Sequence, residues 1–519
     1  MIGFHMSVLL RGPCTSCLRI LWDALFQKTT RLREFGMRIA KRSRLFRALQ
    51  SGRNLLTAAL VLAFLVLAAD QSANALPAFA RKYGLRCSAC HESWPMLNYF
   101  GQKFKDNGYQ LMNDRDAPIW QNPGYWPVTF RITPIWHRVS TGKVDVDTYT
   151  GGAATGTAIQ RVTTSGFDLS GLDFHTGGTL EKNFSFYVLP SSDATAAFHF
   201  ETVMARLDNL FGSPWLNIKL GKFELDNLLS EKRILTLTGN GGIYQLYHFI
   251  PVGDGNIFGQ MGDNQLGVEL MGHSWDDRTR FSASLLSSTD GNVGLPYGNA
   301  YTGFFTVSQA FDTGKLGVDR IGAYAMVGEA PTYYLTSGGT PLAGTGISNK
   351  SFHREGFVGQ FYFGQHFDLQ VVTQHGWDNA WFGQGFGDLI GGTVSGNNVP
   401  GTVLPTGSQA PTWNGVLFEP HYVYSPQLIF IGRYETIQMS RQSNGPGYTG
   451  PAGPSASNFG NISTYTVGFR YNPFMTPRAG FAWHNEYNWL HQDGTGPVLG
   501  LGTANINTSE VLTGFDFDF

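Results

Sequence analysis

From residue 127 to the end of the chain, apolar and polar side chains alternate with a period of two, as they do in β-strands with two unlike faces. Over residues 464–471, the odd-numbered positions are aromatic or aliphatic and the even-numbered positions are Thr, Gly or Arg. About 17 such stretches follow one another, and one of them begins near Tyr244. The alternation predicts strands, but a soluble sandwich and a membrane barrel both alternate in this way.

The connections between the predicted strands alternate in length along the chain. Long connections occupy residues 376–411, 439–462 and 488–507, and short ones occupy residues 364–365, 425–426 and 472–477. Short turns at one side and long loops at the other are the arrangement of outer-membrane β-barrels, whose strand number is even in bacterial single-chain proteins. We therefore expect an all-β fold, a transmembrane antiparallel β-barrel of about 16 strands with an aqueous lumen.

The last predicted strand supports the barrel. Its side chains divide into a lipid face (Val511, Thr513, Phe515, Phe517 and Phe519) and a lumen face (Glu510, Gly514, Asp516 and Asp518). A soluble edge strand with three phenylalanines on one face would be an aggregation hazard. A terminal strand that ends in Phe also resembles the assembly signal of bacterial outer-membrane barrels.

The composition and the N-terminus agree with an exported protein. The chain has 519 residues, 65 of them Gly and 39 Phe, and only 14% are charged. Basic residues from 38 onward, an apolar core at residues 55–69 and the small-x-small sequence Ala73-Asn74-Ala75 predict a cleaved secretory signal. We expect three parts: an N-terminal extension and signal peptide (1–75, removed), a short segment (76–126) and the barrel (127–519).

Removal of the signal would make the protein acidic. Residues 1–75 contain 11 of the 37 basic and 3 of the 38 acidic residues, so the remainder has 26 basic and 35 acidic side chains and a net charge of −9. An acidic exported protein attracts cations and basic partners, and we expect no nucleic-acid partner.

Residues 87–91 read Cys-Ser-Ala-Cys-His, which is the attachment pattern of c-type haem. Cys87 and Cys90 would each form a thioether to the haem, and His91 would be the proximal axial ligand of the iron. A structural disulfide would leave His91 without a purpose, and a structural zinc site needs four ligands where only three are local. The sequence therefore predicts one covalent haem c as the cofactor.

The sixth ligand of the iron stays open at this point. Met112 is far enough along the chain to loop round to the opposite haem face, whereas Met96 follows His91 too closely to reach it easily. A histidine of the barrel wall or a water molecule are the other candidates. Eleven histidines lie beyond residue 126, and the sequence singles out none of them as a metal ligand.

The haem segment is too short to enclose a haem by itself, since so few residues cannot bury much core of their own. We expect the inside of the barrel to supply the missing walls. Within the segment, Ser93 is a candidate cap for a short helix. In the barrel, Lys222, Glu224 and Asp226 are predicted to share the lumen face as a charge network.

Several parts of the segment resemble the N-terminus of the fused monohaem cytochrome–porins. These parts are Phe-Ala-Arg-Lys-Tyr-Gly-Leu at residues 79–85, the haem motif, Pro95, Leu97, Phe100-Gly101, Phe104-Lys105 and Gly108-Tyr109. Members of that family are outer-membrane proteins with a short haem-c domain before a barrel of about 16 strands, and known members act as ferrous-iron oxidases. The close resemblance covers residues 77–110 and implies a ferrous-iron-oxidising activity.

These observations favour an outer-membrane cytochrome with its haem segment on the periplasmic side or in the barrel lumen. It would carry electrons from an extracellular or lumenal donor, with Fe²⁺ as the candidate, to a periplasmic carrier such as a soluble cytochrome. One alternative is a porin whose haem segment is a plug or redox gate. Another is a haem enzyme with an open sixth site. The barrel would contact outer-membrane lipid in each case.

Overall fold

The structure is a computed structural model. It describes residues 77–93, 96–112, 116, 118, 127–150, 153–192, 197–229, 246, 261–262, 264–287, 301–333, 348–379, 401–402, 410, 412–439, 441–443, 456–458, 461–475, 479–493 and 505–519. These residues belong to one compact unit, Gln71–Phe519. The predicted extension, signal peptide and cleavage site lie outside the described residues and stay predictions.

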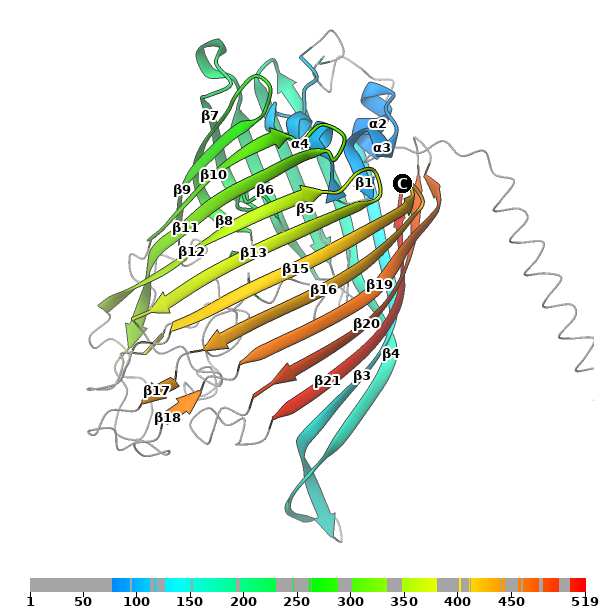
Figure 1. Cartoon of the computed structure of the whole chain (residues 1–519), viewed down its shortest axis with the longest axis vertical. Helices are drawn as coiled ribbons and strands as arrows, with labels where there is room; N and C mark the ends of the chain where they lie inside the picture. The colour runs from blue at the N-terminus through cyan, green and yellow to red at the C-terminus, as the bar shows by residue number, and fades with distance from the viewer. Residues whose placement is uncertain are drawn as a thin grey trace, which may run out of the picture. The chain divides into compact units, whose positions relative to one another are not determined.

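Sixteen long antiparallel strands of the described chain close into a barrel, as the sequence predicts (Figure 1). They are β3 (Val128–Thr150), β4 (Ala153–Glu181), β5 (Phe184–Ser192), β6 (Phe198–Leu207), β7 (Asn217–Phe223), β8 (Gln265–His273), β9 (Thr279–Ser287), β10 (Tyr301–Asp312), β11 (Val318–Tyr333), β12 (Ser348–Tyr362), β13 (Phe367–Asp378), β15 (Thr412–Ser425), β16 (Leu428–Met439), β19 (Ile462–Met475), β20 (Gly480–Gln492) and β21 (Ile506–Asp518). Of the shorter strands after residue 126, β14 (Gly401–Thr402) pairs parallel with the end of β11, and β17 (Arg441–Ser443) pairs with β18 (Ala456–Asn458).

The ring closes where the last strand meets the first. β21 pairs antiparallel with β3, and beyond the strand end Phe519 and Phe130 exchange two backbone hydrogen bonds of 2.9 and 3.0 Å. Their rings stack with centroids 5.3 Å apart. The predicted division of the last strand is confirmed, because Val511 and Phe515 are exposed on the outside while Asp516 is buried on the inside.

The prediction that a barrel strand begins near Tyr244 is wrong. β7 pairs directly with β8, with Asn217 opposite Met271, which leaves no place for a strand between them. In the part of the connecting segment that the structure describes, Leu246 lies inside the barrel instead. Its backbone N–H donates to the Glu435 carboxylate (2.6 Å), and its side chain is fully buried.

The outer face of the barrel is apolar and the inner face is mixed. Large side chains such as Val307, Phe357 and Val467 are more than half exposed on the outer face, which is the surface expected against lipid. Inside, buried charges occur together with a hydrophobic cluster that includes Leu246 and Trp413. The expectation of an aqueous lumen is therefore only partly right, because the chain folds part of itself into the space.

The charge network predicted on β7 is also only partly right. Lys219 and Phe223 face the lumen, where Lys219 forms an ion pair with Glu269, while Lys222 lies on the opposite face beside Leu220. The aromatic side chain at position 223 takes the inward position, because it packs in the hydrophobic cluster of the lumen. Asp226, beyond the strand, does face inward.

The N-terminal segment forms three short helices and a small hairpin at the short-turn end of the barrel (Figure 1). The elements are α2 (Pro77–Tyr83), α3 (Cys87–Cys90), β1 (His91–Ser93), β2 (Met96–Leu97) and α4 (Tyr99–Asp106), and a 3-10 turn, η1 (Leu210–Gly212), lies in the barrel part. None of the helices that the structure describes has the length and apolar character of a membrane-spanning helix.

We expect deletion of Phe519 to weaken the seam between β21 and β3, since it removes two backbone hydrogen bonds and one stacked aromatic pair. The cost is about 3 kcal/mol. The fraction of protein that migrates as a folded barrel in unheated SDS gels should fall. The Phe519→Tyr variant keeps both kinds of contact and should fold as the parent does. Equal folding of the deletion and the parent would contradict this account of the seam.

Candidate functional site

The Cys-x-x-Cys-His motif folds as one helical turn followed by a strand. Gly84, with φ at +62°, ends α2 and turns the chain, so that α3 begins at Cys87 three residues later. The motif's last two residues are buried: Cys90 packs against Ala80 and Ala89, and His91 starts the β1–β2 hairpin opposite Leu97. Cys87 and Cys90 therefore lie at the two ends of one helical turn, and His91 follows directly as the first residue of β1.

Asn98 holds the motif turn and the start of α4 together. Its side-chain oxygen accepts a hydrogen bond from the Gly101 N–H (2.9 Å) and caps α4, while its amide donates to the Ala89 carbonyl (3.1 Å) at the end of α3. Its own backbone N–H donates to the Cys90 carbonyl (2.9 Å). The predicted cap at Ser93 is wrong, because Ser93 ends β1 and the helix begins only at Tyr99.

Gly101 allows α4 to pack directly on the backbone of the motif. A Cβ atom at this position would lie 2.0 Å from the Cys90 carbonyl oxygen, so any larger residue would force the two apart. Cys90 itself is a free thiol, and its burial raises its pKa to about 11.

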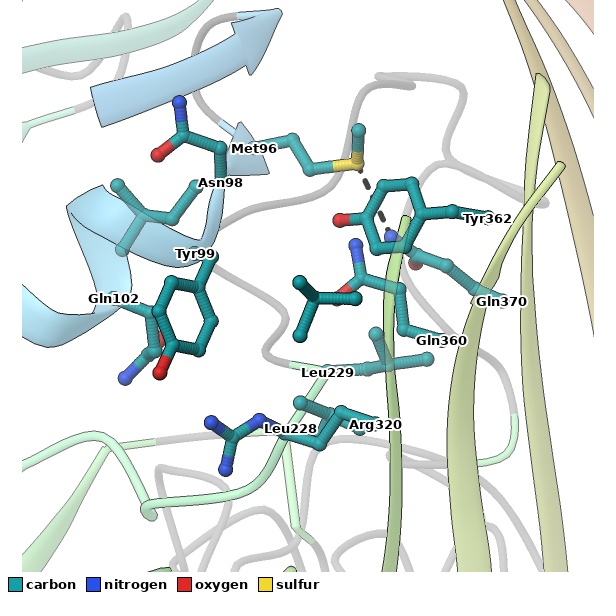
Figure 2. Close-up of a pocket in the computed structure, with 12 residues that line it drawn as sticks. Met96, Asn98, Tyr99, Gln102, Leu228, Leu229, Arg320, Gln360, Tyr362 and Gln370 are labelled. Atoms are coloured by element: carbon teal, nitrogen blue, oxygen red, sulfur yellow. Dashed lines mark hydrogen bonds between the residues drawn. The ribbon is translucent and has the colours of Figure 1, made fainter. Parts of the chain in front are cut away.

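A pocket opens beside the hairpin that carries His91 (Figure 2). The space in it that no atom occupies, including its open side, is about 570 Å³. Its lining combines the haem segment, the lumenal segment after β7 and the barrel wall: Met96, Leu97, Asn98, Tyr99, Gln102, Leu228, Leu229, Val318, Arg320, Gln360, Tyr362 and Gln370. The pocket is therefore assembled by residues from three distant parts of the chain.

The structure brings only one of the two candidate methionines to this pocket. Met96 is buried in the lining, where its sulfur accepts a hydrogen bond from the Gln370 amide (3.1 Å) and its side chain packs against Ile429 and Ile431. Met112 is 44% exposed and does not line the pocket. The assignment of either as an iron ligand stays a prediction.

Glu92, directly after the motif histidine, connects the segment to the barrel wall. The Tyr362 hydroxyl donates a hydrogen bond to its carboxylate. Burial, and to a smaller extent the nearby Asp368 charge, raise the pKa of Glu92 to about 7. The hydrogen bond from Tyr362 lowers this pKa, but by less. Sequence reasoning missed this contact and the Gln370 contact, because no local pattern relates residues 270 or more positions apart.

Two arginines of the barrel wall fix the far end of α4. Arg280 forms an ion pair with the Asp106 carboxylate (2.6 Å), and it also reaches Asp226 (3.1 Å). Arg206 donates to the backbone carbonyls of Lys105 and Asp106, each at 2.8 Å. Burial by itself raises the pKa of Asp106, but the charges of Arg280, His273 and Lys105 together bring this pKa below its ordinary value.

The N-terminal end of the segment, helix α2, is held by contacts with β3 and β4. Arg81 donates to the Val128 carbonyl (2.8 Å), the Ala78 N–H donates to the Thr129 hydroxyl (3.1 Å) and the Lys82 ammonium donates to the Thr179 hydroxyl (3.0 Å). Between the two ends, Phe79 stacks on Tyr109 with centroids 5.0 Å apart. The barrel wall thus provides surroundings that the short segment cannot build alone.

The residues of the motif fit a covalently attached haem c. The donor set is one cysteine at the start of a helical turn, a second cysteine at its end and a histidine directly after it. A pocket with apolar and amide side chains begins at Leu97, the strand partner of that histidine. We see no comparable fit to a structural zinc ion, which needs a fourth ligand.

No protein-family model matches the chain, and no curated protein sequence matches it. Among solved structures, it is similar to the outer membrane channel DcaP of Acinetobacter baumannii (11% identity, 75% of this chain and 96% of that chain, TM-score 0.40). It is also similar to an anion-selective porin from Comamonas acidovorans (12%, 76% and 99%, TM-score 0.44) and to OprB of Pseudomonas putida (10%, 83% and 99%, TM-score 0.41). These similarities concern the barrel fold.

Substitution of Gly101 by Ala should reduce the amount of haem bound per chain, because the new Cβ would displace α4 from the Cys90 carbonyl. Covalent haem is measured from the optical spectrum after denaturation, and barrel folding from heat-modifiable migration in SDS gels. Gly480→Ala is the matched control, since a Cβ there meets nothing within 4 Å. Full haem loading of a folded Gly101→Ala protein would contradict the proposed role of this close approach.

Proposed function

We propose that this protein is an outer-membrane electron carrier, in which one haem c at the short-turn mouth of the barrel passes electrons to a periplasmic partner. The observation that carries the proposal is the motif geometry: a helical turn from Cys87 to Cys90, then His91, fixed against the barrel beside a pocket. A bound haem c supplies one-electron redox chemistry at its iron.

The chain's own residues have separable tasks in this proposal. Cys87 and Cys90 would hold the haem through thioether bonds, His91 would bind its iron, and Asn98 holds the turn that presents them. Leu97 and Leu229 line the pocket and keep water from one side of it. Glu92, which accepts a hydrogen bond from Tyr362, ties the residue after His91 to the barrel wall.

The position of the segment supports a periplasmic partner. The motif lies at the end of the barrel with short turns, which in outer-membrane barrels is the periplasmic end. The hydrocarbon layer is about 30 Å thick, so a single haem cannot serve both faces by itself. A small donor such as Fe²⁺ would have to reach the haem, and the net charge of −9 on residues 76–519 favours a cation.

We expect the purified, haem-loaded protein to show one reversible redox transition in a potentiometric titration, and its haem to become reduced when Fe²⁺ is added without oxygen. Both changes are followed in the optical spectrum. Cys90→Ala should lose thioether-bound haem, whereas Cys14→Ala should keep it, since residue 14 lies in the part predicted to be removed.

The covalent haem and its redox transition test the electron-carrier function, and the reduction by Fe²⁺ tests ferrous iron as the electron donor. A parent protein that retains no covalent haem would contradict the electron-carrier function altogether. A reversible transition without any reduction by Fe²⁺ would contradict ferrous iron as the donor, and the carrier function would stand with a different reductant.

A second candidate function is a porin in which the same segment acts as a plug. The observation that favours it is the buried contact of Asp106 with Arg280, together with the two backbone contacts of Arg206, because they hold α4 in the barrel mouth. Opening would require these contacts to break. Because the pKa of Asp106 is lowered, its carboxylate is charged at neutral pH and stabilises the docked position of α4. This stabilisation is lost only as the pH falls through that lowered pKa.

For the plug, we expect Asp106→Asn to raise the conductance of planar bilayers at pH 7, because loss of a charged hydrogen bond costs about 2 kcal/mol and shifts the segment toward its undocked state. Asp276→Asn is the control, since Asp276 pairs with Arg278 on an exposed turn. Equal and low conductance of both variants and the parent would argue against the plug and leave the electron carrier.

A further inference from the structure

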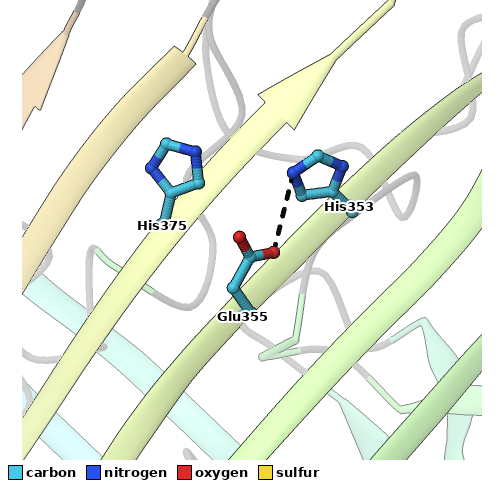
Figure 3. A group of neighbouring side chains, drawn as sticks. All are labelled: His353, Glu355 and His375. Carbon is cyan, nitrogen blue, oxygen red and sulfur yellow. Dashed lines mark ion pairs between the residues drawn. The ribbon is translucent and has the colours of Figure 1, made fainter.

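Three potential metal ligands gather on the outer face of the barrel. His353 and Glu355 lie two positions apart on β12, and His375 lies on β13 directly opposite Glu355. Their neighbours Phe352 and Val358 are buried in the lumen, whereas Phe357 is 65% exposed, so the three side chains are on the outward face. Figure 3 shows them pointing toward one another from the two strands.

The ligand atoms are close enough to bind one ion. One nitrogen from each histidine and one oxygen of Glu355 all lie within 4.8 Å of one another. The His353 Nε2 and the Glu355 carboxylate are 3.6 Å apart. This grouping arises only from strand register, because residues 353 and 375 belong to different strands of one hairpin.

Both imidazole rings are oriented by neighbours outside the group. The His375 Nδ1 is 2.9 Å from the Asn414 side-chain oxygen, and Asn414 lies directly opposite it on β15. When Nδ1 carries the proton and donates it there, Nε2 is left as the ligand atom. His353 is stacked on Trp377, with centroids 5.2 Å apart and planes 19° apart. Such outer contacts are typical of metal-binding histidines.

We propose that His353, Glu355 and His375 form a binding site for a divalent first-row transition-metal ion. Two imidazoles and one carboxylate suit Zn²⁺ or Fe²⁺, and three protein ligands leave at least one position for water or an anionic oxygen. The proposal goes beyond electron transfer at the haem motif and does not depend on it.

The location of the cluster gives an ion access from outside. β12 begins and β13 ends at the long-loop end of the barrel. His375 lies close to that end of β13, whereas Glu355 is at the middle of β12. Toward the other end, the outward positions become apolar, with Phe357 and Val371. A carboxylate that faces outward is costly at the middle of a bilayer but not at its interface, so the proposed site requires Glu355 to lie at the interface, within reach of hydrated cations.

The test measures Zn²⁺ bound to the full, haem-loaded chain without an affinity tag, by equilibrium dialysis and elemental analysis. We expect the parent to bind one more Zn²⁺ per chain than His375→Gln, and the affinity to fall roughly tenfold or more in His353→Gln and Glu355→Gln. Asn414→Ala should weaken binding roughly tenfold while it keeps the stoichiometry. X-ray absorption at the zinc edge should show two imidazole ligands in the parent.

His366→Gln is the matched control, since it removes a histidine from the turn at the other end of the same hairpin, where its ring contacts the Val423 carbonyl. It should bind Zn²⁺ as the parent does. Equal Zn²⁺ binding by the parent and by all three ligand variants would overturn the proposal and leave His353 and Glu355 as a simple ion pair. Haem content, measured in every variant, reports separately on the proposed function.

Discussion

The structure depends on the buried contact of Asp106 with Arg280 and Arg206 of the barrel wall. The haem segment is too short to bury a core, so its position has to be fixed by something larger. Arg280 supplies a charge for the Asp106 carboxylate, and Arg206 binds the last carbonyls of α4, where the helix dipole is negative. A charge that is removed from water in this way is stable only with its partner in place, which makes the docked position specific.

The local geometry of the motif follows from that fixed helix. Since α4 is held at its far end, Gly101 at its near end can pack on the Cys90 carbonyl, and Asn98 can join α3 to α4. The turn that carries Cys90 and His91 is thus oriented against a rigid wall rather than on a loose tail. The proposed electron transfer and the alternative plug would both depend on this arrangement, because the same contacts hold α4 and the motif against the barrel wall.

The wall of the barrel has two unlike chemical faces, and the strand register decides what meets on each. Inside, alternate residues bring charges and apolar side chains together around the segment. Outside, the same alternation gives an apolar surface, on which His353, Glu355 and His375 come together. A shift of β12 by one residue would place His353 and Glu355 in the lumen and Phe352 in lipid.

The sequence by itself determined the barrel, its strand number, the faces of its last strand and the identity of the motif residues Cys87, Cys90 and His91. These follow from local signals, namely a period of two, alternating connection lengths and a five-residue spacing, which need no knowledge of distant contacts. Only the tertiary structure decided that Leu246 lies in the lumen rather than in a strand near Tyr244, that Phe223 rather than Lys222 faces inward, and that Asn98 rather than Ser93 caps α4. It alone decided the contacts of Glu92, Met96 and Asp106 as well, because they join positions more than 100 residues apart through the closure of the barrel, which no local pattern encodes.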